Sequence, residues 1–298
     1  VTNKIQKDEI VNQLKEIPKE NIIEEPFGKN TAAAIGLASI FVENKHKDAV
    51  TIVLPADHLI NDKTEFQRVI SEATHYAYEN KSLVTIGINP TRPDTGYGYI
   101  QIDENEKETL HKVLRFAEKP NLETAQRFLE SGDFFWNSGM FIWRTDVILS
   151  EIKKYMVDLY EGLETIKKSI DKNNFTDVLI KVYGQLKSVS IDYGIMESSK
   201  IVKLIKGKFD WSDVGSWDAV YHLLEKDKNN NVAKGDVYFG NSTGNYVNSD
   251  KKFTAVIGVN DVFVINTDDA TLVCHRDYAQ DVKLVVDFLK MNEKKELL

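Results

Sequence analysis

The order of apolar runs along the chain constrains the fold more than any other feature. Between about residues 20 and 220, short apolar and β-branched runs alternate with amphipathic segments. Residues 49–54 and 83–88 are predicted to be strands buried on both faces, and residues 64–78 and 121–130 are predicted to be helices. This alternation predicts an α/β domain around a parallel or mixed sheet with helices on both faces.

Local signals mark the ends of the two predicted helices. Thr64 and Gln67 have the spacing of a capping box at the start of the first helix. Asn121 is the expected N-cap of the second helix, and Gly132 follows its last turn.

The pattern changes after about residue 225. Residues 225–231 form a polar linker, and short β-like runs separated by Gly, Asn and Asp follow it. These runs cover residues 236–239, 245–247, 253–259, 262–266 and 270–275. They predict a small β unit, either a sandwich or a solenoid, before a closing helix over residues 280–290. We therefore place one domain at residues 1–224 and a β-rich region with a terminal helix at residues 225–298.

Composition excludes several classes of protein and partner. The net charge of −8 disfavours duplex nucleic acid as a partner. Apolar runs fall short of the roughly 20 residues that span a bilayer, so we expect no membrane insertion. Cys274 is the only cysteine, which excludes an internal disulfide and indicates a reducing, cytoplasmic setting.

One apparent motif is a decoy. Residues 240–244 read GNSTG and match the G-x-S-x-G pattern of a hydrolase nucleophile. That motif needs a helix after it, whereas the next residues are strand-like. We expect a hairpin loop here.

Two carboxylates stand where a divalent ion is expected. Asp57 directly follows the predicted strand at residues 49–54, and ligands of open α/β sheets bind beyond the carboxyl ends of strands. Asp213 lies in a polar loop between two tryptophans. The pair suits Mg²⁺, which takes one or two protein carboxylates and substrate phosphate oxygens. Each aspartate is equally consistent with a helix or turn cap.

Polar residues in three other segments suit a sugar phosphate. Glu118 can accept hydrogen bonds from hydroxyls and Lys119 can face a phosphate, although adjacent side chains on an extended segment point apart. Asn137 and Ser138 can reach sugar hydroxyls, and Gly98 lets the backbone approach a ligand. A surface ion pair, core aromatics and a tight turn are the purely structural explanations.

Residues 25–34 form a loop that opens a helix of small residues. Backbone N–H groups at a helix N-terminus favour anions or polar base edges. An ordinary helix start, capped by Asn30 or Thr31, explains the same residues.

Taken together and in order, these segments resemble one family. EPFGKNTAAAI, LPADH, TGYGYI, FAEKP, WNSGMF, SIDYGIMES and WSDVGSW are similar to the mannose-1-phosphate guanylyltransferases, a branch of the sugar nucleotidyltransferases. The resemblance runs from residue 1 to about residue 224 and continues through residues 258–269 and 281–285.

The resemblance implies a fold and a reaction. The fold would be a GT-A-like, Rossmann-type α/β domain followed by a small β-solenoid-like region. The phosphate oxygen of mannose 1-phosphate would attack the α-phosphate of GTP in line, with Mg²⁺, giving GDP-mannose and pyrophosphate.

The resemblance also implies roles for residues at the matching positions. Asp57 and Asp213 would bind Mg²⁺ and, with Lys119, would be catalytic. The nucleotide would be bound near Lys29, Asn30, Thr31 and Asp57. The mannosyl phosphate would contact Gly98, Glu118, Lys119 and Asn137, and Asp192 and Tyr193 would line or support the sugar pocket.

The chain departs from the family at its start. Family members begin with a strand and a Gly-rich loop of the form GGxGxRLWPLS, which binds the triphosphate, and residues 1–3 match the end of the family's second strand. We therefore expect an N-terminally incomplete domain with little or no transferase activity by itself. A related sugar-1-phosphate nucleotidyltransferase and a non-catalytic sugar-nucleotide-binding or regulatory subunit are the alternatives. A homo-oligomer stays open.

Overall fold

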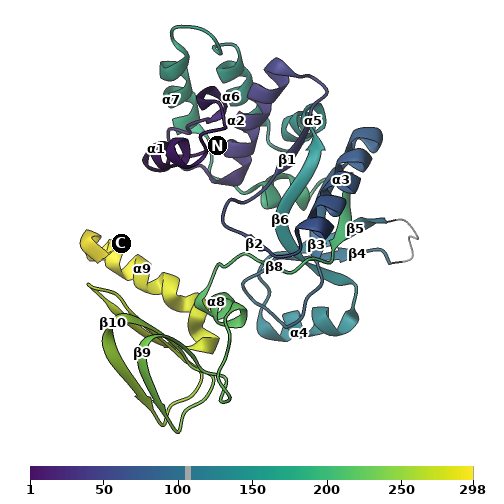
Figure 1. Cartoon of the computed structure of the whole chain (residues 1–298). Helices are drawn as coiled ribbons and strands as arrows, with labels where there is room; N and C mark the ends of the chain where they lie inside the picture. Colours follow the sequence, from purple (N-terminus) through teal and green to yellow (C-terminus); the bar gives the residue numbers. More distant parts are fainter. Residues whose placement is uncertain (105–108, 298) are drawn as a thin grey trace. The chain divides into compact units, whose positions relative to one another are not determined.

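A computed structural model describes residues 1–104 and 109–297 (Figure 1). Backbone contacts divide the chain into two compact units. The first unit consists of residues 1–56 and 61–209, and the second of residues 57–60 and 210–298. The change of composition after residue 224 falls inside the second unit, and the domain boundary placed there stays a prediction.

The first unit is built around a mixed sheet with the strand order β1-β6-β3-β7-β5-β4, in which β4 also pairs with β6. Strands β3 and β7 are parallel, and the other pairings are antiparallel. The strands are β1 (Val50–Val53), β3 (Leu83–Ile88), β4 (Tyr99–Ile102), β5 (Leu110–Ala117), β6 (Phe134–Arg144) and β7 (Val202–Gly207). The predicted α/β class and mixed sheet are confirmed.

Helices surround this sheet. They are α1 (Lys4–Gln13), α2 (Asn30–Lys45), α3 (Lys63–Asn80), α4 (Leu122–Ser131), α5 (Thr145–Tyr155), α6 (Val157–Lys167) and α7 (Phe175–Gln185), with short turns η1 (Lys19–Asn21) and η2 (Asp192–Met196). Helix α3 packs on β1, β3, β6 and β7, whereas α2, α5, α6 and α7 pack on one another (Figure 1).

The main core lies where α2 meets α6 and the sheet. Leu37 and Ile40 of α2, Trp143 of β6 and Leu163 of α6 are all nearly inaccessible to solvent. A Cβ added to Gly36 would lie 2.6 Å from Leu163 Cδ1. The small residues of α2 therefore allow the close helix packing that fixes its N-terminus.

The predicted helices are present, but one cap is different. Asp62 caps α3, and its side chain accepts the Glu65 N–H at 3.0 Å, so the predicted capping box of Thr64 and Gln67 is wrong. The N-cap of α4 is Asn121, as predicted, and its Oδ1 accepts the Thr124 N–H at 2.9 Å. Gly132 ends α4 at φ +80°, a conformation that favours glycine.

The strand predicted at residues 49–54 is present, but the expectation that it is buried on both faces is wrong. Ile52 is 42% exposed and Leu54 is 47% exposed. Strand β1 is the last in the sheet order, and in the described part of the chain its partner is β6, which is antiparallel to it. A β-branched run indicates a strand but not how many neighbours the strand has.

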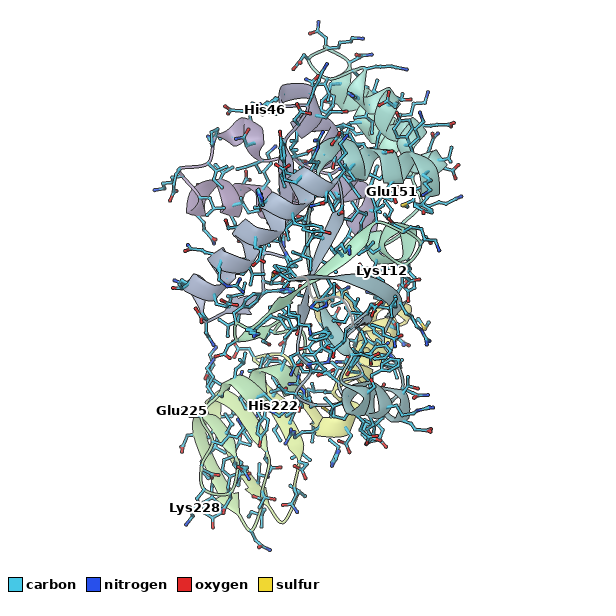
Figure 2. The ribbon with its side chains drawn as sticks, turned by 90° about the vertical axis from the view of Figure 1, so that its right-hand side faces the viewer. His46, Lys112, Glu151, His222, Glu225 and Lys228 are labelled. Carbon is cyan, nitrogen blue, oxygen red and sulfur yellow. The ribbon has the colours of Figure 1, made fainter. Side chains whose placement is uncertain are left out.

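The second unit begins with a short antiparallel pair, β2 (Leu59–Ile60) and β8 (Trp211–Ser212). Helix α8 (Trp217–Leu223) leads to the linker that holds Glu225 and Lys228 (Figure 2). The strands that follow are β9 (Val232–Gly240), β10 (Tyr246–Ile257), β11 (Val262–Asn266) and β12 (Thr271–His275). The closing helices are η3 (Arg276–Asp281), α9 (Val282–Met291) and η4 (Lys295–Leu297).

The β-rich region is solenoid-like. Its order is β12-β11-β10-β9, in which β9, β10 and β11 run parallel and β12 is antiparallel. The predicted runs at residues 245–247 and 253–259 belong largely to one long strand, β10, whose pairing shifts register between Ser249 and Thr254. The predicted β unit and closing helix are confirmed, and the solenoid alternative is the one observed.

Residues 240–244 join two strands, so no nucleophile elbow exists there. Because β9 and β10 are parallel, the segment is a solenoid corner and not the hairpin that we predicted. Ser242 is buried, and its hydroxyl donates to the Val256 carbonyl at 3.3 Å. Within residues 1–104 and 109–297, every helix is too short or too polar to cross a bilayer.

Candidate active site

Strand pairing in the first unit brings three predicted residues together. Gly98 precedes β4, Glu118 follows β5 and Asn137 lies in β6, and β4 pairs with both of the other strands. The Asn137 N–H donates to the Gly98 carbonyl at 2.8 Å. A Cβ added to Gly98 would lie 2.5 Å from Glu118 Oε2, so a side chain at this position would displace the carboxylate.

Asn137 joins this group to Asp192, which is 55 residues away in the sequence. Its Nδ2 donates to Asp192 Oδ1 at 2.7 Å, and its Oδ1 accepts the Gly139 N–H at 3.2 Å. Thr85 of β3 donates to the same Oδ1 at 3.5 Å. The amide is therefore held at both ends. We call Gly98, Glu118, Asn137 and Asp192 the sugar subsite, after the contacts that the family resemblance predicts for them.

Burial and mutual repulsion act on the carboxylates around this subsite. Burial raises the pKa of Asp192, although the hydrogen bond from Asn137 opposes this. Burial and the nearby Asp192 raise the pKa of Glu118, against the pull of Lys119. The pKa of Glu197 is raised by the same two causes, burial and Asp192. Carboxylates that are partly withdrawn from water and close together favour hydrogen-bond donors such as sugar hydroxyls.

Two predicted residues at this site have a different environment. Lys119 is exposed and its backbone has φ +44°, which turns the chain directly after Glu118. Tyr193 is 57% exposed, and its pKa is raised by desolvation and then by Glu118. Both residues are close enough to Glu118 to interact with it electrostatically.

The start of α2 lies against the segment that leads to Asp192. Thr31 Oγ1 accepts the Ile191 N–H at 2.9 Å, and Lys29 Nζ donates to the Gly184 carbonyl at 2.9 Å. Asn30 adopts φ +66°, and its Oδ1 accepts the N–H of Thr31 at 2.8 Å. Lys29 holds the N-cap position without a side-chain capping bond. Of the predicted nucleotide residues, Thr31 is therefore bonded to the residue before Asp192 within the first unit, whereas Asp57 belongs to the second unit.

The predicted metal ligands lie in the second unit. Leu59 pairs with Ser212 in the antiparallel β2–β8 ladder, so Asp57 and Asp213 lie at the same end of that short pair. Asp213 Oδ1 accepts the Gly215 N–H at 3.0 Å. Burial lowers the pKa of His58 and is the larger effect. The charges of Asp57 and Asp213 are close enough to act in the opposite direction and raise this pKa. We call Asp57 and Asp213 the carboxylate pair.

The carboxylate pair fits the donor set of Mg²⁺. Oxygen ligands suit this ion, and it usually keeps several waters besides one or two carboxylates and substrate phosphates. Among the described residues, no group of three or more His, Cys, Asp or Glu side chains is arranged to hold a metal. Two carboxylates would leave the other positions around such an ion to water and phosphate oxygens.

Sequence reasoning did not single out several residues that belong to these clusters. Glu197 stands within SIDYGIMES and joins the carboxylates around Asp192. His58 stands within LPADH, and its Nδ1 accepts the Trp211 Nε1–H at 3.1 Å. Both lie in segments that carry the family resemblance, but only their partners across the fold show what they contact.

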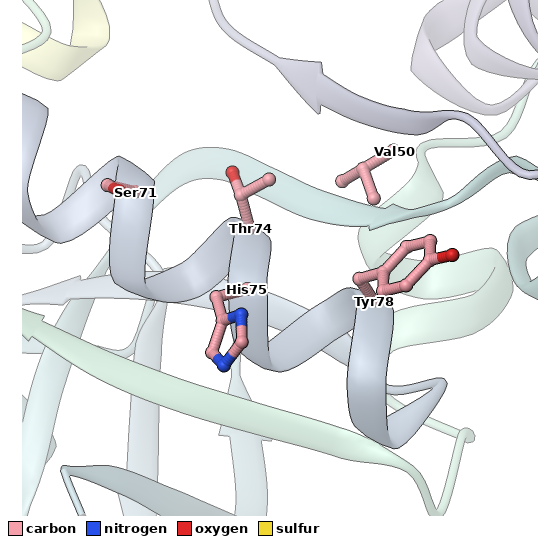
Figure 3. A pocket seen from close by; sticks show the side chains of 5 residues that line it. All are labelled: Val50, Ser71, Thr74, His75 and Tyr78. Atoms are coloured by element: carbon pink, nitrogen blue, oxygen red, sulfur yellow. The ribbon is translucent and has the colours of Figure 1, made fainter.

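A pocket of about 410 Å³ has none of the predicted residues in its lining. It is lined by Val50, Ser71, Thr74, His75 and Tyr78 (Figure 3). Glu151 of α5 is a further feature outside these clusters (Figure 2). Its side chain is buried, and its carboxylate accepts a hydrogen bond from the Ser199 hydroxyl. Neither feature adds a group to the sugar subsite or to the carboxylate pair.

Comparisons with known proteins match both parts of the chain. Residues 1–230 match the family model described as nucleotidyl transferase, and residues 240–289 match the one described as MannoseP isomerase/GMP-like beta-helix domain. A mannose-1-phosphate guanylyltransferase of Klebsiella pneumoniae is 39% identical over 293 residues, which is 96% of this chain and 62% of that protein. The chain thus spans less than two thirds of the length of this relative.

Solved structures show the same similarity. A crystal structure described as mannose-1-phosphate geranyltransferase from Thermus thermophilus superposes with a TM-score of 0.83 at 29% identity. The match covers 97% of this chain and 82% of that one. A crystal structure described as mannose-6-phosphate isomerase from Helicobacter pylori gives a TM-score of 0.59 at 31% identity, over 70% of this chain and 82% of that one.

Proposed function

Because the chain belongs to the nucleotidyl transferase family, we propose that it serves as the catalytic region of a mannose-1-phosphate guanylyltransferase. In the proposed reaction, a phosphate oxygen of mannose 1-phosphate attacks the α-phosphorus of GTP. The bond between the α-phosphorus and the bridging oxygen to the β-phosphate breaks, and pyrophosphate leaves with that oxygen. GDP-mannose is the other product.

The observation that carries the proposal is the sugar subsite. Its carboxylates offer hydrogen-bond acceptors for hydroxyls, and Asn137 is fixed by bonds at both ends of its amide. The exposed Lys119 stands next to Glu118 and can pair with the phosphate of the same substrate. A ligand with several hydroxyls and one phosphate matches this set of groups.

The nucleotide is proposed to bind beside this subsite. Lys29, Asn30 and Thr31 lie at the start of α2, a position that favours anions or polar base edges, although the N–H groups of Thr31 and Ala32 already donate to Asn30 Oδ1 and to the Val189 carbonyl. The bond between Thr31 and Ile191 links this helix start to Asp192. A ligand that joins a guanosine phosphate to a sugar would contact both places.

Asp57 and Asp213 are proposed to hold Mg²⁺. When bound, the ion would neutralise charge on the phosphates, which is the main requirement of phosphoryl transfer. Asp57 is exposed and Asp213 is half-buried, so substrate oxygens and water have access to the pair. A cytoplasmic setting is part of the proposal and is supported by the single cysteine, Cys274.

The proposal is tested by calorimetric binding of GDP-mannose in Mg²⁺, with UDP-glucose and ADP-glucose as competitors. We expect GDP-mannose to bind at least about tenfold more tightly than either competitor, a difference of about 1.4 kcal/mol. Equal binding of all three would favour the related transferase. Absence of GDP-mannose binding would overturn the proposal.

A further inference from the structure

Arg92 makes a two-pronged ion pair just before the sugar subsite. Its Nε and Nη2 donate to Asp94 Oδ2 at 3.0 and 2.7 Å. The Asp94 side chain is 16% exposed and that of Arg92 is 29% exposed, so the pair is largely withdrawn from water. Arg92 is therefore committed to Asp94 and is not an open anion site.

The same guanidinium lies over two aromatic rings. Its carbon is 5.2 Å from the ring centre of Trp136 and 5.9 Å from that of Tyr97. These rings meet edge to face at 4.9 Å and are almost completely buried. A planar guanidinium can stack and form a fork at once, which an ammonium cannot.

Asp94 also holds the residues that follow it. Its other oxygen, Oδ1, accepts the Gly96 N–H at 2.8 Å, and its carbonyl accepts the hydroxyl of the buried Tyr99 at 2.9 Å. Residues 92–98, which we call the Arg92 turn, are thus fixed at both ends. The turn finishes at Gly98, whose carbonyl accepts the Asn137 N–H.

We propose that Arg92 is a positioning residue for the sugar subsite. Through Asp94 it fixes the Arg92 turn, and the turn holds Gly98 against Glu118 and Asn137. Arg92 touches no reacting atom in this role. The inference rests on the proposed function, because it assigns the subsite to the mannosyl group.

The chain contains a matched control at the other end of β6. Arg144 donates from Nε and Nη2 to Asp146, also two residues later, at 3.0 and 2.8 Å. Its carbon lies 5.4 Å from the ring centre of Tyr78. Arg144→Lys therefore removes the same kind of fork and stacking without touching the sugar subsite.

The first experiment reads the turn directly and needs no ligand. Hydrogen–deuterium exchange of residues 92–98 is compared in wild type, Arg92→Lys and Arg144→Lys. We expect exchange in this segment to rise by about tenfold in Arg92→Lys and to stay within about twofold in Arg144→Lys. Unchanged exchange in Arg92→Lys would overturn the inference.

The second experiment measures calorimetric dissociation constants for GDP-mannose and for GDP. We expect Arg92→Lys to raise the constant for GDP-mannose by about tenfold, the equivalent of about 1.4 kcal/mol. The constant for GDP should change by less than about twofold, and Arg144→Lys should change neither, since a general loss of stability would not select the sugar.

Asp94→Asn provides a second route that leaves Arg92 in place. Each single variant should weaken GDP-mannose binding similarly, and Arg92→Lys with Asp94→Asn should be no worse than either alone, because both break one interaction. Additive effects, or equal weakening of GDP, would overturn the inference. If the wild-type protein binds no GDP-mannose, the proposed function is overturned instead. The exchange data would still show whether Arg92 fixes the Arg92 turn.

Discussion

The sugar subsite and the carboxylate pair contain similar side chains in opposite settings. The sugar subsite is partly buried between β4, β5 and β6, and its polar groups bond to one another before any ligand arrives. The carboxylate pair lies on loops beside a ladder of two residues per strand, and Asp57 is exposed. The first is fixed by the fold, whereas the second includes the exposed Asp57 and the half-buried Asp213.

This difference follows from what each site is proposed to bind. A sugar is recognised by the directions of its hydroxyls, which calls for acceptors held in place by packing. A hydrated Mg²⁺ ion brings water ligands and meets phosphate oxygens, so it needs fewer fixed protein groups. Substitutions in the sugar subsite should therefore change stability and binding together, whereas those in the carboxylate pair should change chemistry alone.

The largest effect is expected in the carboxylate pair. In a protein that joins this chain to the Gly-rich N-terminal segment of a relative, Asp57→Asn or Asp213→Asn should lower Mg²⁺-dependent pyrophosphate release by at least about 100-fold, because a bound metal supplies several kcal/mol of charge stabilisation. The free energy of unfolding should stay within about 0.5 kcal/mol, as for other solvent-accessible substitutions.

The control for this prediction is Asp268→Asn, an exposed carboxylate of the same unit that pairs with Lys251. It should alter neither turnover nor stability. Unchanged turnover in Asp57→Asn or in Asp213→Asn would remove that residue from the metal site.

The next largest effect is expected in the sugar subsite. Asn137→Asp replaces the donor that lies 2.7 Å from Asp192 Oδ1 with a second carboxylate. We expect the free energy of unfolding at pH 7 to fall by about 3 kcal/mol, the cost of leaving a partly buried charge unpaired. The loss should shrink at lower pH as the two carboxyls share a proton. Urea denaturation at several pH values measures it.

Asn121→Asp is the control, because it makes the same chemical change at a helix N-terminus, where a negative charge is stabilising. Asn121 caps α4. This variant should be as stable as wild type or slightly more stable. Equal losses in the two variants would contradict the prediction for Asn137.

The local elements could be predicted from sequence because their causes are local. The cap of α4 by Asn121 and its end at Gly132 depend on neighbouring residues, and both are observed. The burial of residues 49–54 depends on how many strands flank β1, which the run itself does not encode. The cap of α3 was missed because Asp62 competes with Thr64 for the same role.

The candidate site could be predicted only as separate segments. Asn137 and Asp192 are 55 residues apart and meet only because η2 is brought to β6 by tertiary packing. The fork of Arg92 and Asp94 is local, but its connection to Gly98 depends on the register of β4 against β6. Motif resemblance named the residues, and the fold supplied their contacts.

We expect Asp192→Asn to raise the free energy of unfolding and to weaken GDP-mannose binding. Because burial raises the pKa of Asp192, the native state keeps this proton to a higher pH than the unfolded state does. The native state then binds more protons, so the free energy of unfolding falls as pH rises through this range. At pH 8 the variant should be more stable than wild type by about 0.5–2 kcal/mol and should bind GDP-mannose more weakly.

Asp133→Asn is the matched opposite. Burial acts to raise the pKa of Asp133. Hydrogen bonds from Gln101 and Ser131 outweigh this effect and keep that pKa below its ordinary value. This variant should lose stability at neutral pH, and the loss should shrink as the pH falls through the pKa of Asp133. Urea denaturation of both variants from about pH 2 to pH 8 checks the two signs, and an Asp192→Asn protein less stable than wild type at pH 8 would refute the first.

The smallest effect is expected beside the carboxylate pair. The Trp211 indole is only a donor, so the His58 Nδ1 that it contacts must accept, and the neutral ring carries its proton on Nε2. Nitrogen NMR at a pH where His58 is neutral should show this tautomer. Trp211→Phe should release it and lower the free energy of unfolding by about 0.5–1.5 kcal/mol. Trp217→Phe, which alters a ring packed on Tyr246, should leave the His58 signals unchanged. A proton on Nδ1 in the wild type would contradict the bond between Trp211 and His58 beside the carboxylate pair.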